Sequence, residues 1–189
     1  EHFSLYAVQL LSATEIEIDG SQLGSITSGG SFRLTSDATW SDPIIITRDT
    51  VLDLNGCGVC YQGTGSFLVV NSDATLTIKD SQAPSEETVD LGGSNPYGNT
   101  ASLSEDGSTL TYYITESTAN GTGTTETLIK HKVPLANAGK ILCKEGSDQV
   151  IKVENGGTLE LKSGVLQGTG VRHIVYVEDG TLNVSGGYI

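Results

Sequence analysis

The stretch FLVVNSDATLTIKDS, residues 67–81, decides the fold because it places two short strand patterns on either side of one turn. In residues 68–70 (LVV) and again in residues 76–78 (LTI), positions two apart are apolar. This spacing is typical of a strand with one buried face, since successive side chains point to opposite sides. Residues 71–74 (NSDA) are of types that favour turns. We therefore predict a strand, a turn and a second strand.

The same pattern returns in three other places. Residues 44–56, 151–164 and 175–187 match it with their apolar and turn residues in register. The leucine that opens the second strand stands at positions 52, 76, 159 and 182, so the spacings are 24, 83 and 23 residues. The middle spacing corresponds to one repeat plus an insertion. A repeat of this length indicates a stacked array of coils.

These repeats are too short for strand-helix-strand units, which need about 30 residues or more. We predict an all-β fold, a parallel β-helix of about four coils, in which equivalent strands of successive coils pair about 4.8 Å apart. Residues 59–61 and 165–166, each followed by Gln-Gly-Thr-Gly, would form a third and weaker side. Equivalent inward side chains should stack in two ladders, one of Ile44, Leu68, Ile151 and Val175, the other of Leu52, Leu76, Leu159 and Leu182.

Three segments connect the chain with a known fold family. They are TVLDLNG at residues 50–56, ATLTIKDS at 74–81, and the segment 156–164, which begins with GGTL and ends with SG. In these motifs the chain resembles the right-handed β-helix of the pectin-lyase-like superfamily, and more narrowly the β-helix domains of large secreted or wall-attached proteins of gut bacteria. The resemblance covers roughly residues 30–81 and 139–189. It implies a right-handed β-helix and an extracellular location, but no single activity, because one fold hosts many functions.

We expect a single β-helix domain, residues 1–189, made of four parts. Residues 1–30 are predicted to cap the array, because the end of a β-helix exposes unpaired strand edges. Residues 31–81 form the first coils, residues 82–139 an insertion, and residues 140–189 the later coils. The last coil is incomplete at the C-terminus, as expected for part of a longer protein.

The insertion contains a predicted β-hairpin. Residues 108–115 (STLTYYIT) and 124–133 (TTETLIKHKV) flank the turn sequence NGTG at 120–123. Insertions in solenoid proteins often form the binding face. A tyrosine offers such a face a flat apolar ring for a sugar and a hydroxyl for hydrogen bonding. The tyrosines that we predict to bind a ligand are Tyr97, Tyr112, Tyr113 and Tyr176.

The charge of the chain limits its partners. With 23 Asp and Glu against 10 Lys and Arg, the formal net charge is −13, which argues against a nucleic-acid partner. An acidic polysaccharide would also be repelled unless calcium bridged the carboxylates. No apolar run approaches the roughly 18 residues needed to cross a membrane, so this segment should not insert into one.

No metal centre or cofactor is predicted. Cys57, Cys60 and Cys143 are too few for a disulfide framework, and the CxxC spacing of the first two lacks the further ligands of a zinc site. Three acidic turns at equivalent positions would suit calcium between coils, but nonapeptide calcium repeats are missing, and structural turn chemistry is the preferred interpretation. These turns lie at residues 71–73, 154–155 and 178–179.

Four residues are the weak candidates for catalysis. Asp53 and Glu160 are predicted on one outward file, two coils and about 10 Å apart, a separation that would suit an inverting glycosidase. Arg172 with His173 would supply the basic group of a lyase. The Asn-Thr-Asp, Asp-Asp, Gly-His-Gly and Arg-x-Lys motifs of pectin hydrolases do not occur. Solvated residues on an outer face are therefore the preferred interpretation.

The hypothesis that best fits these observations is a non-catalytic module of a secreted or cell-surface protein. It would serve adhesion or glycan binding, with a polysaccharide or a surface protein as its partner. Two alternatives stay open: a polysaccharide lyase or glycoside hydrolase, and a purely structural stalk. Whether carboxylates gather around a concavity would distinguish an enzyme from a binding module.

Overall fold

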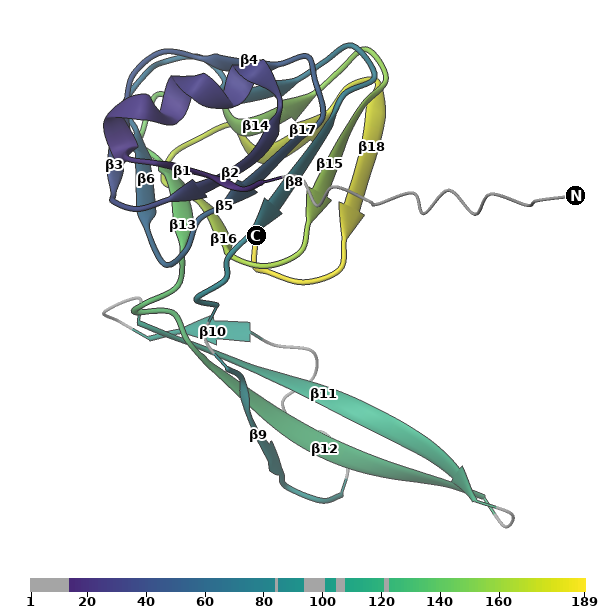
Figure 1. The fold of residues 1–189 in the computed structure, drawn as a ribbon. Helices are drawn as coiled ribbons and strands as arrows, with labels where there is room; N and C mark the ends of the chain where they lie inside the picture. Colours follow the sequence, from purple (N-terminus) through teal and green to yellow (C-terminus); the bar gives the residue numbers. More distant parts are fainter. Residues whose placement is uncertain (1–13, 84, 94–100, 105–107, 121–122) are drawn as a thin grey trace, which may run out of the picture.

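The computed structural model describes residues 14–83, 85–93, 101–104, 108–120 and 123–189, and in these the chain is all-β apart from one short helix. The strands form three parallel sheets, A, B and C, and one antiparallel sheet, D (Figure 1). We call sheets A to C the parallel body and sheet D the insertion sheet. Within the described residues, no helix is long and apolar enough to cross a membrane.

The strands of the parallel body come from both halves of the chain. Sheet A has the order β1 (Ile16–Ile18), β2 (Gly30–Leu34), β5 (Thr50–Asp53), β8 (Thr75–Lys79), β15 (Gly157–Leu161) and β18 (Gly180–Val184). Sheet B has the order β16 (Val165–Gly168), β13 (Lys140–Cys143), β6 (Gly58–Tyr61) and β3 (Ala38–Trp40). Sheet C has the order β17 (His173–Val177), β14 (Gln149–Val153), β7 (Leu68–Val70) and β4 (Ile44–Ile46).

From β2 to β18 the chain visits sheets A, B and C in a fixed cyclic order, interrupted only by the insertion sheet between β8 and β13. All strand pairs within these sheets are parallel, for example β4 with β7 and β7 with β14. The predicted parallel pairing between repeats is confirmed. This arrangement is compatible with a β-helix-like fold.

The first predicted ladder is confirmed in full. Ile44 pairs with Leu68, Leu68 with Ile151, and Ile151 with Val175. The first three of these side chains are almost completely buried, and buried residues of sheets A, B and C and of the helix form one continuous apolar cluster. The three sheets therefore share a single core.

The second predicted ladder is wrong at one step. Leu76 pairs with Leu159 and Leu159 with Leu182 as predicted, but Leu52 lies opposite Ile78 instead of Leu76. The turn after β7 is longer than the turn after β4, so β8 enters sheet A two positions later than β5. A shift of two residues keeps every side chain on the same face of the sheet. Alternation alone therefore does not reveal the shift.

Residues 14–30 close one end of the parallel body. Strand β1 pairs in parallel with β2. A 3-10 helix, η1 (Gly20–Ser28), follows, and Asp19 caps it by accepting a hydrogen bond from the Ser21 N–H. Leu23 and Ile26 of η1 are fully buried in the shared core. The helix thus covers apolar side chains that the end of the sheets would otherwise expose (Figure 1).

The insertion sheet has the order β10 (Ala101–Leu103), β11 (Thr109–Asn120), β12 (Gly123–Pro134) and β9 (Glu87–Asp90). The long strands β11 and β12 pair antiparallel along their whole length, which confirms the predicted hairpin. A second apolar cluster lies at the base of this sheet and includes Val133, Leu135 and Val165, with Tyr112 and Tyr188 packed against it. It joins the insertion sheet to the end of sheet B.

Candidate functional site

A carboxylate, a phenol and an imidazole meet at the base of the insertion sheet. Tyr112 of β11 lies directly opposite His131 of β12, and their rings stack with centroids 4.6 Å apart and planes 4° apart. The Tyr112 hydroxyl donates a hydrogen bond of 2.5 Å to Glu86 Oε1. His131 Nδ1 lies 2.5 Å from the same oxygen. Glu86, just before β9, therefore holds both rings in place.

Local pairing explains why these three residues meet. In an antiparallel pair, residues directly opposite each other project from the same face, so Tyr112 and His131 lie side by side. Strand β9 pairs with the other edge of β12, with Glu87 opposite Lys132. This brings Glu86 alongside the end of β12 and within reach of the two rings.

The environment keeps the phenols at this site protonated. Burial raises the pKa of Tyr112, and the hydrogen bond to Glu86 and the charge of that carboxylate raise it further. Burial also raises the pKa of Tyr188, and the charge of Glu86 adds to the effect. Both hydroxyls are therefore neutral hydrogen-bonding groups at physiological pH.

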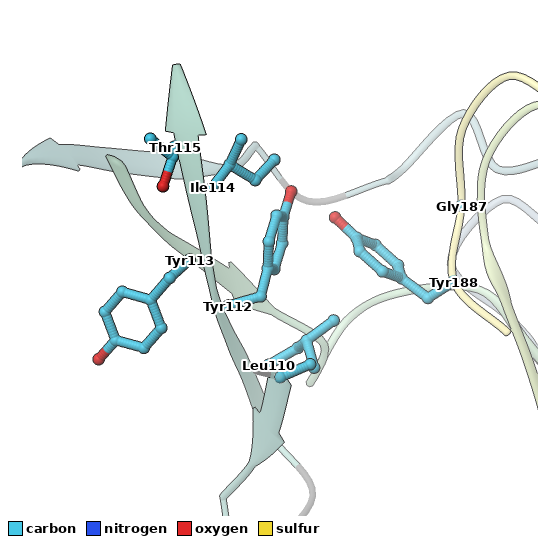
Figure 2. A pocket seen from close by; sticks show the side chains of 8 residues that line it. Leu110, Tyr112, Tyr113, Ile114, Thr115, Gly187 and Tyr188 are labelled. Atoms are coloured by element: carbon cyan, nitrogen blue, oxygen red, sulfur yellow. The ribbon is translucent and has the colours of Figure 1, made fainter. Parts of the chain in front are cut away.

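An open groove of about 740 Å³ separates β11 from the end of the parallel body. Tyr188 enters from the body side and points toward Tyr112, as Figure 2 shows. The backbone of Tyr188 is held at the edge of sheet B, because its N–H donates to the Gly164 carbonyl and its carbonyl accepts from the Leu166 N–H. The other described residues that line the groove are Ala101, Leu110, Tyr113, Ile114, Thr115 and Gly187.

A smaller cavity of about 180 Å³ adjoins this groove and shares Gly187 and Tyr188 with it. Glu86 and Ser163 line it together with Ala83, Ala138, Gly164 and Val165. We call the groove and this cavity together the aromatic groove. It offers flat apolar rings, hydroxyl groups and one carboxylate.

The four predicted ligand-binding tyrosines are not all in one place. Tyr112 and Tyr113 both line the groove, although Tyr113 projects from the other side of β11 (Figure 2). Tyr176 lies in β17 of sheet C, where its ring tilts against His173 at a centroid distance of 5.2 Å. Tyr97 lies outside the described residues.

The prediction that Asp53 and Glu160 share one outward file is wrong, for the same reason as the second ladder. Asp53 lies opposite Lys79, whereas Glu160 lies opposite Thr77. Asp53 is completely buried, with its Oδ2 3.4 Å from Lys79 Nζ and 3.7 Å from Arg33 Nε. Glu160 Oε2 accepts a hydrogen bond from the Thr77 hydroxyl and lies 3.2 Å from Lys162 Nζ. The two carboxylates therefore do not face each other as an acid pair.

The charge of Asp53 should stabilise the fold above pH 4. Burial acts to raise the pKa of Asp53, but hydrogen bonds from the Ser81 and Asn55 N–H groups and the charge of Lys79 outweigh it, so the pKa lies below its ordinary value of 3.8. Because the pKa is lower in the folded chain than in the unfolded chain, the charged carboxylate stabilises the fold at pH values above the unfolded pKa. This stabilisation is lost as the pH falls through the folded pKa. We expect Asp53→Asn to lower the free energy of unfolding by about 2 kcal/mol at pH 7. The difference in the free energy of unfolding between the variant and the wild type should narrow toward pH 3 in urea titrations. A difference that does not change with pH would contradict this account.

Arg172 precedes sheet C, and His173 is the first residue of β17 in that sheet. Their backbone N–H groups both donate to the Asp148 carbonyl, at 3.0 and 3.2 Å. Neither residue lines the aromatic groove within its described part. The structure thus brings His173 together with Tyr176, but not with Asp53 or Glu160 as a catalytic set.

The cysteines and the acidic turns were considered as metal or redox sites, and their contacts in the structure are as follows. Cys57, Cys60 and Cys143 are free thiols, and burial raises the pKa of Cys143 to about 12, with a further contribution from Cys60, so it is a poor nucleophile. At the turns, Lys152 pairs with both Glu154 and Glu178. Within the described ranges, no group of three His, Cys, Asp or Glu residues has the geometry of a metal site.

Sequence reasoning missed Glu86, His131 and Tyr188 as members of a site. His131 had a usable signal, because counting back from the pair Asn120 and Gly123 at the end of the hairpin places it opposite Tyr112. Glu86 and Tyr188 had none. Glu86 reaches the site because β9 pairs with β12, and Tyr188 reaches it because the insertion sheet packs against the end of sheet B.

Comparisons with known proteins identify no relative of this chain. The chain matches no protein-family model, and no curated protein and no solved structure is similar to it at a significant level.

Proposed function

We propose that this chain is a right-handed parallel β-helix module of a longer secreted or surface-attached bacterial protein, and that it binds glycans without catalysing a reaction. The cyclic order of parallel strands in sheets A, B and C supports the architecture. The resemblance to pectin-lyase-like β-helices supports the hand and the extracellular location. The aromatic groove supports the binding function.

The observation that carries the proposal is the position of Tyr112 and Tyr188. They come from the insertion sheet and from the parallel body, and they lie on opposite sides of one groove (Figure 2). Its volume of about 740 Å³ lies within the range of about 300–1,000 Å³ that is usual for small-molecule sites. Tyrosine combines a broad apolar face with a polar hydroxyl, which suits the apolar faces and hydroxyl edges of a sugar.

The groove also fits recognition better than hydrolysis. Its carboxylate, Glu86, already accepts a hydrogen bond from Tyr112 and contacts His131. The two carboxylates considered for catalysis are also paired with cations, Asp53 with Lys79 and Glu160 with Lys162. A glycosidase usually needs two carboxyl groups on either side of the scissile bond, and the described lining of the aromatic groove contains one.

A glycan panel with matched tyrosine variants tests the proposal. We expect the wild type to bind at least one plant or mucin oligosaccharide, and Tyr112→Ala to weaken that binding at least tenfold, because the ring and its hydroxyl form one wall of the groove. Tyr176→Ala, on sheet C, is the control and should bind like the wild type. Circular dichroism should show that both variants are folded.

Three outcomes would count against the proposal. If the panel is blank but the chain binds a cell-surface protein, the partner is a protein. If both are blank for the chain and for its full-length parent, the module is a structural stalk. Release of reducing or unsaturated sugar from any polysaccharide would instead favour the enzyme.

A further inference from the structure

Glu86 places a negative charge directly on the aromatic groove. Its Oε1 lies 2.5 Å from the Tyr112 hydroxyl oxygen and 2.5 Å from His131 Nδ1. Its side chain also lines the smaller cavity, which Tyr188 lines as well. The carboxylate therefore lies at the proposed sugar-binding surface, in contact with Tyr112 and in the lining of a cavity that Tyr188 shares.

Both rings respond to that charge. After burial, the hydrogen bond and the charge of Glu86 are the next causes that raise the pKa of Tyr112. The charge of Glu86 is likewise the second cause that raises the pKa of Tyr188. An anionic group on a ligand that stacks on either ring would meet the same unfavourable field.

The rest of the described lining is uncharged. Alanine, leucine, isoleucine, valine, threonine, serine, glycine and tyrosine residues make up the other positions of the groove and of the cavity. The chain as a whole has a formal charge of −13, which adds to the repulsion at long range. A carboxylate or sulfate on a ligand would therefore be desolvated near Glu86 with no lysine, arginine or histidine in the described lining, and the imidazole of His131 already contacts Glu86.

We infer that Glu86 determines the specificity of the aromatic groove and restricts it to uncharged glycans, excluding uronate, sialylated and sulfated chains. The inference rests on the proposed glycan-binding function and extends it to a substrate class. A neutral sugar meets no like charge in this groove, whereas an anionic group held close to Glu86 would be repelled. That difference corresponds to at least a tenfold preference for the neutral ligand.

Three matched pairs of oligosaccharides test the inference by titration calorimetry at low ionic strength, where charge effects are least screened. The probes are hexamers of glucose, galactose and mannose and hexamers of the corresponding uronic acids. We expect the wild type to bind at least one neutral hexamer at least tenfold more tightly than its uronate. Glu86→Gln removes the charge but keeps an oxygen that accepts from Tyr112, so it should reduce that preference about tenfold, mainly by improving uronate binding.

Glu87→Gln is the matched control, because Glu87 is the exposed neighbour of Glu86 and lines neither the groove nor the cavity in their described parts. It should leave the preference unchanged. If the wild type binds uronates as tightly as neutral hexamers or more tightly, the inference is overturned while glycan binding stays intact. The same holds if Glu86→Gln keeps the wild-type preference for neutral hexamers over uronates. If none of the six hexamers binds and the glycan panel is also blank, the proposed function itself is overturned.

Discussion

Replacing Ile46 by aspartate is expected to unfold the chain. Ile46 lies in β4, pairs with Val70, and is completely buried in the core that sheets A, B and C share. An aspartate there would place an unpaired charge in an apolar interior, which costs about 3–5 kcal/mol in typical cases, besides the apolar contacts that are lost. The total stability of a domain is only about 5–15 kcal/mol, so little folded protein should remain.

The neighbouring residue provides the control. Ile45 projects from the other face of the same strand and is 51% exposed. Ile45→Asp makes the same chemical change one position away and should cost no more than about 1 kcal/mol. Far-UV circular dichroism and urea titration of the two variants measure the difference. Equal stability of Ile45→Asp and Ile46→Asp would show that the faces of sheet C are not arranged as described.

The second large effect is expected at Asp80, where the insertion leaves and rejoins the parallel body. Asp80 Oδ1 accepts hydrogen bonds from the N–H groups of Gly56 and Gln82, and Oδ2 accepts one of 2.6 Å from Gly139. Gly139 lacks a side chain at a position where a Cβ atom would lie only 2.9 Å from the Asp80 carboxyl carbon. One buried carboxylate thus joins three separate segments of backbone.

Asp80→Ala should lower the free energy of unfolding by about 3 kcal/mol, because it leaves N–H donors without a partner around a buried position. Urea titration measures the loss, and hydrogen exchange at Gln82 and Gly139 should become faster. Asp90→Ala is the control, since Asp90 is exposed and accepts from Gly92 in a solvent-exposed segment. A loss in Asp80→Ala no greater than in Asp90→Ala would contradict the role of Asp80 as the anchor of the insertion.

Much of the parallel body was predictable because its physical cause is local. Alternating apolar residues at a fixed repeat specify which side chains stack, and Ile44, Leu68, Ile151 and Val175 do stack. The register of β5 against β8 was not predictable in this way. It depends on the difference in length between two turns, and a two-residue shift leaves the alternation intact.

The burial of Asp53 follows from the same shift. In the predicted register Asp53 would lie on the file of Thr77 and Glu160, facing solvent. In the observed register it lies between Arg33 and Lys79, and both cations also contact Glu15. A candidate acid thereby becomes part of an ion-pair network, so an error of two residues in pairing changed its chemical interpretation.

The candidate site was predictable only in part. The hairpin and its tyrosines follow from the sequence, because strand alternation and the NGTG turn are local signals. The meeting of Tyr112 with Tyr188 depends on how the insertion sheet packs against the end of sheet B, and its meeting with Glu86 depends on how β9 pairs with β12. No local pattern encodes either. Tyr188, which points toward Tyr112, was therefore not among the tyrosines that the sequence singled out.

Hydrogen–deuterium exchange of the wild-type chain tests the central claim most directly. It should be measured with and without the neutral oligosaccharide that binds most tightly in the glycan panel. A ligand in the aromatic groove should slow exchange in residues 109–115 of β11 and in residues 186–189, which together form its two walls. Protection confined to β14 and β17 around Tyr176, with none in those two segments, would contradict the account.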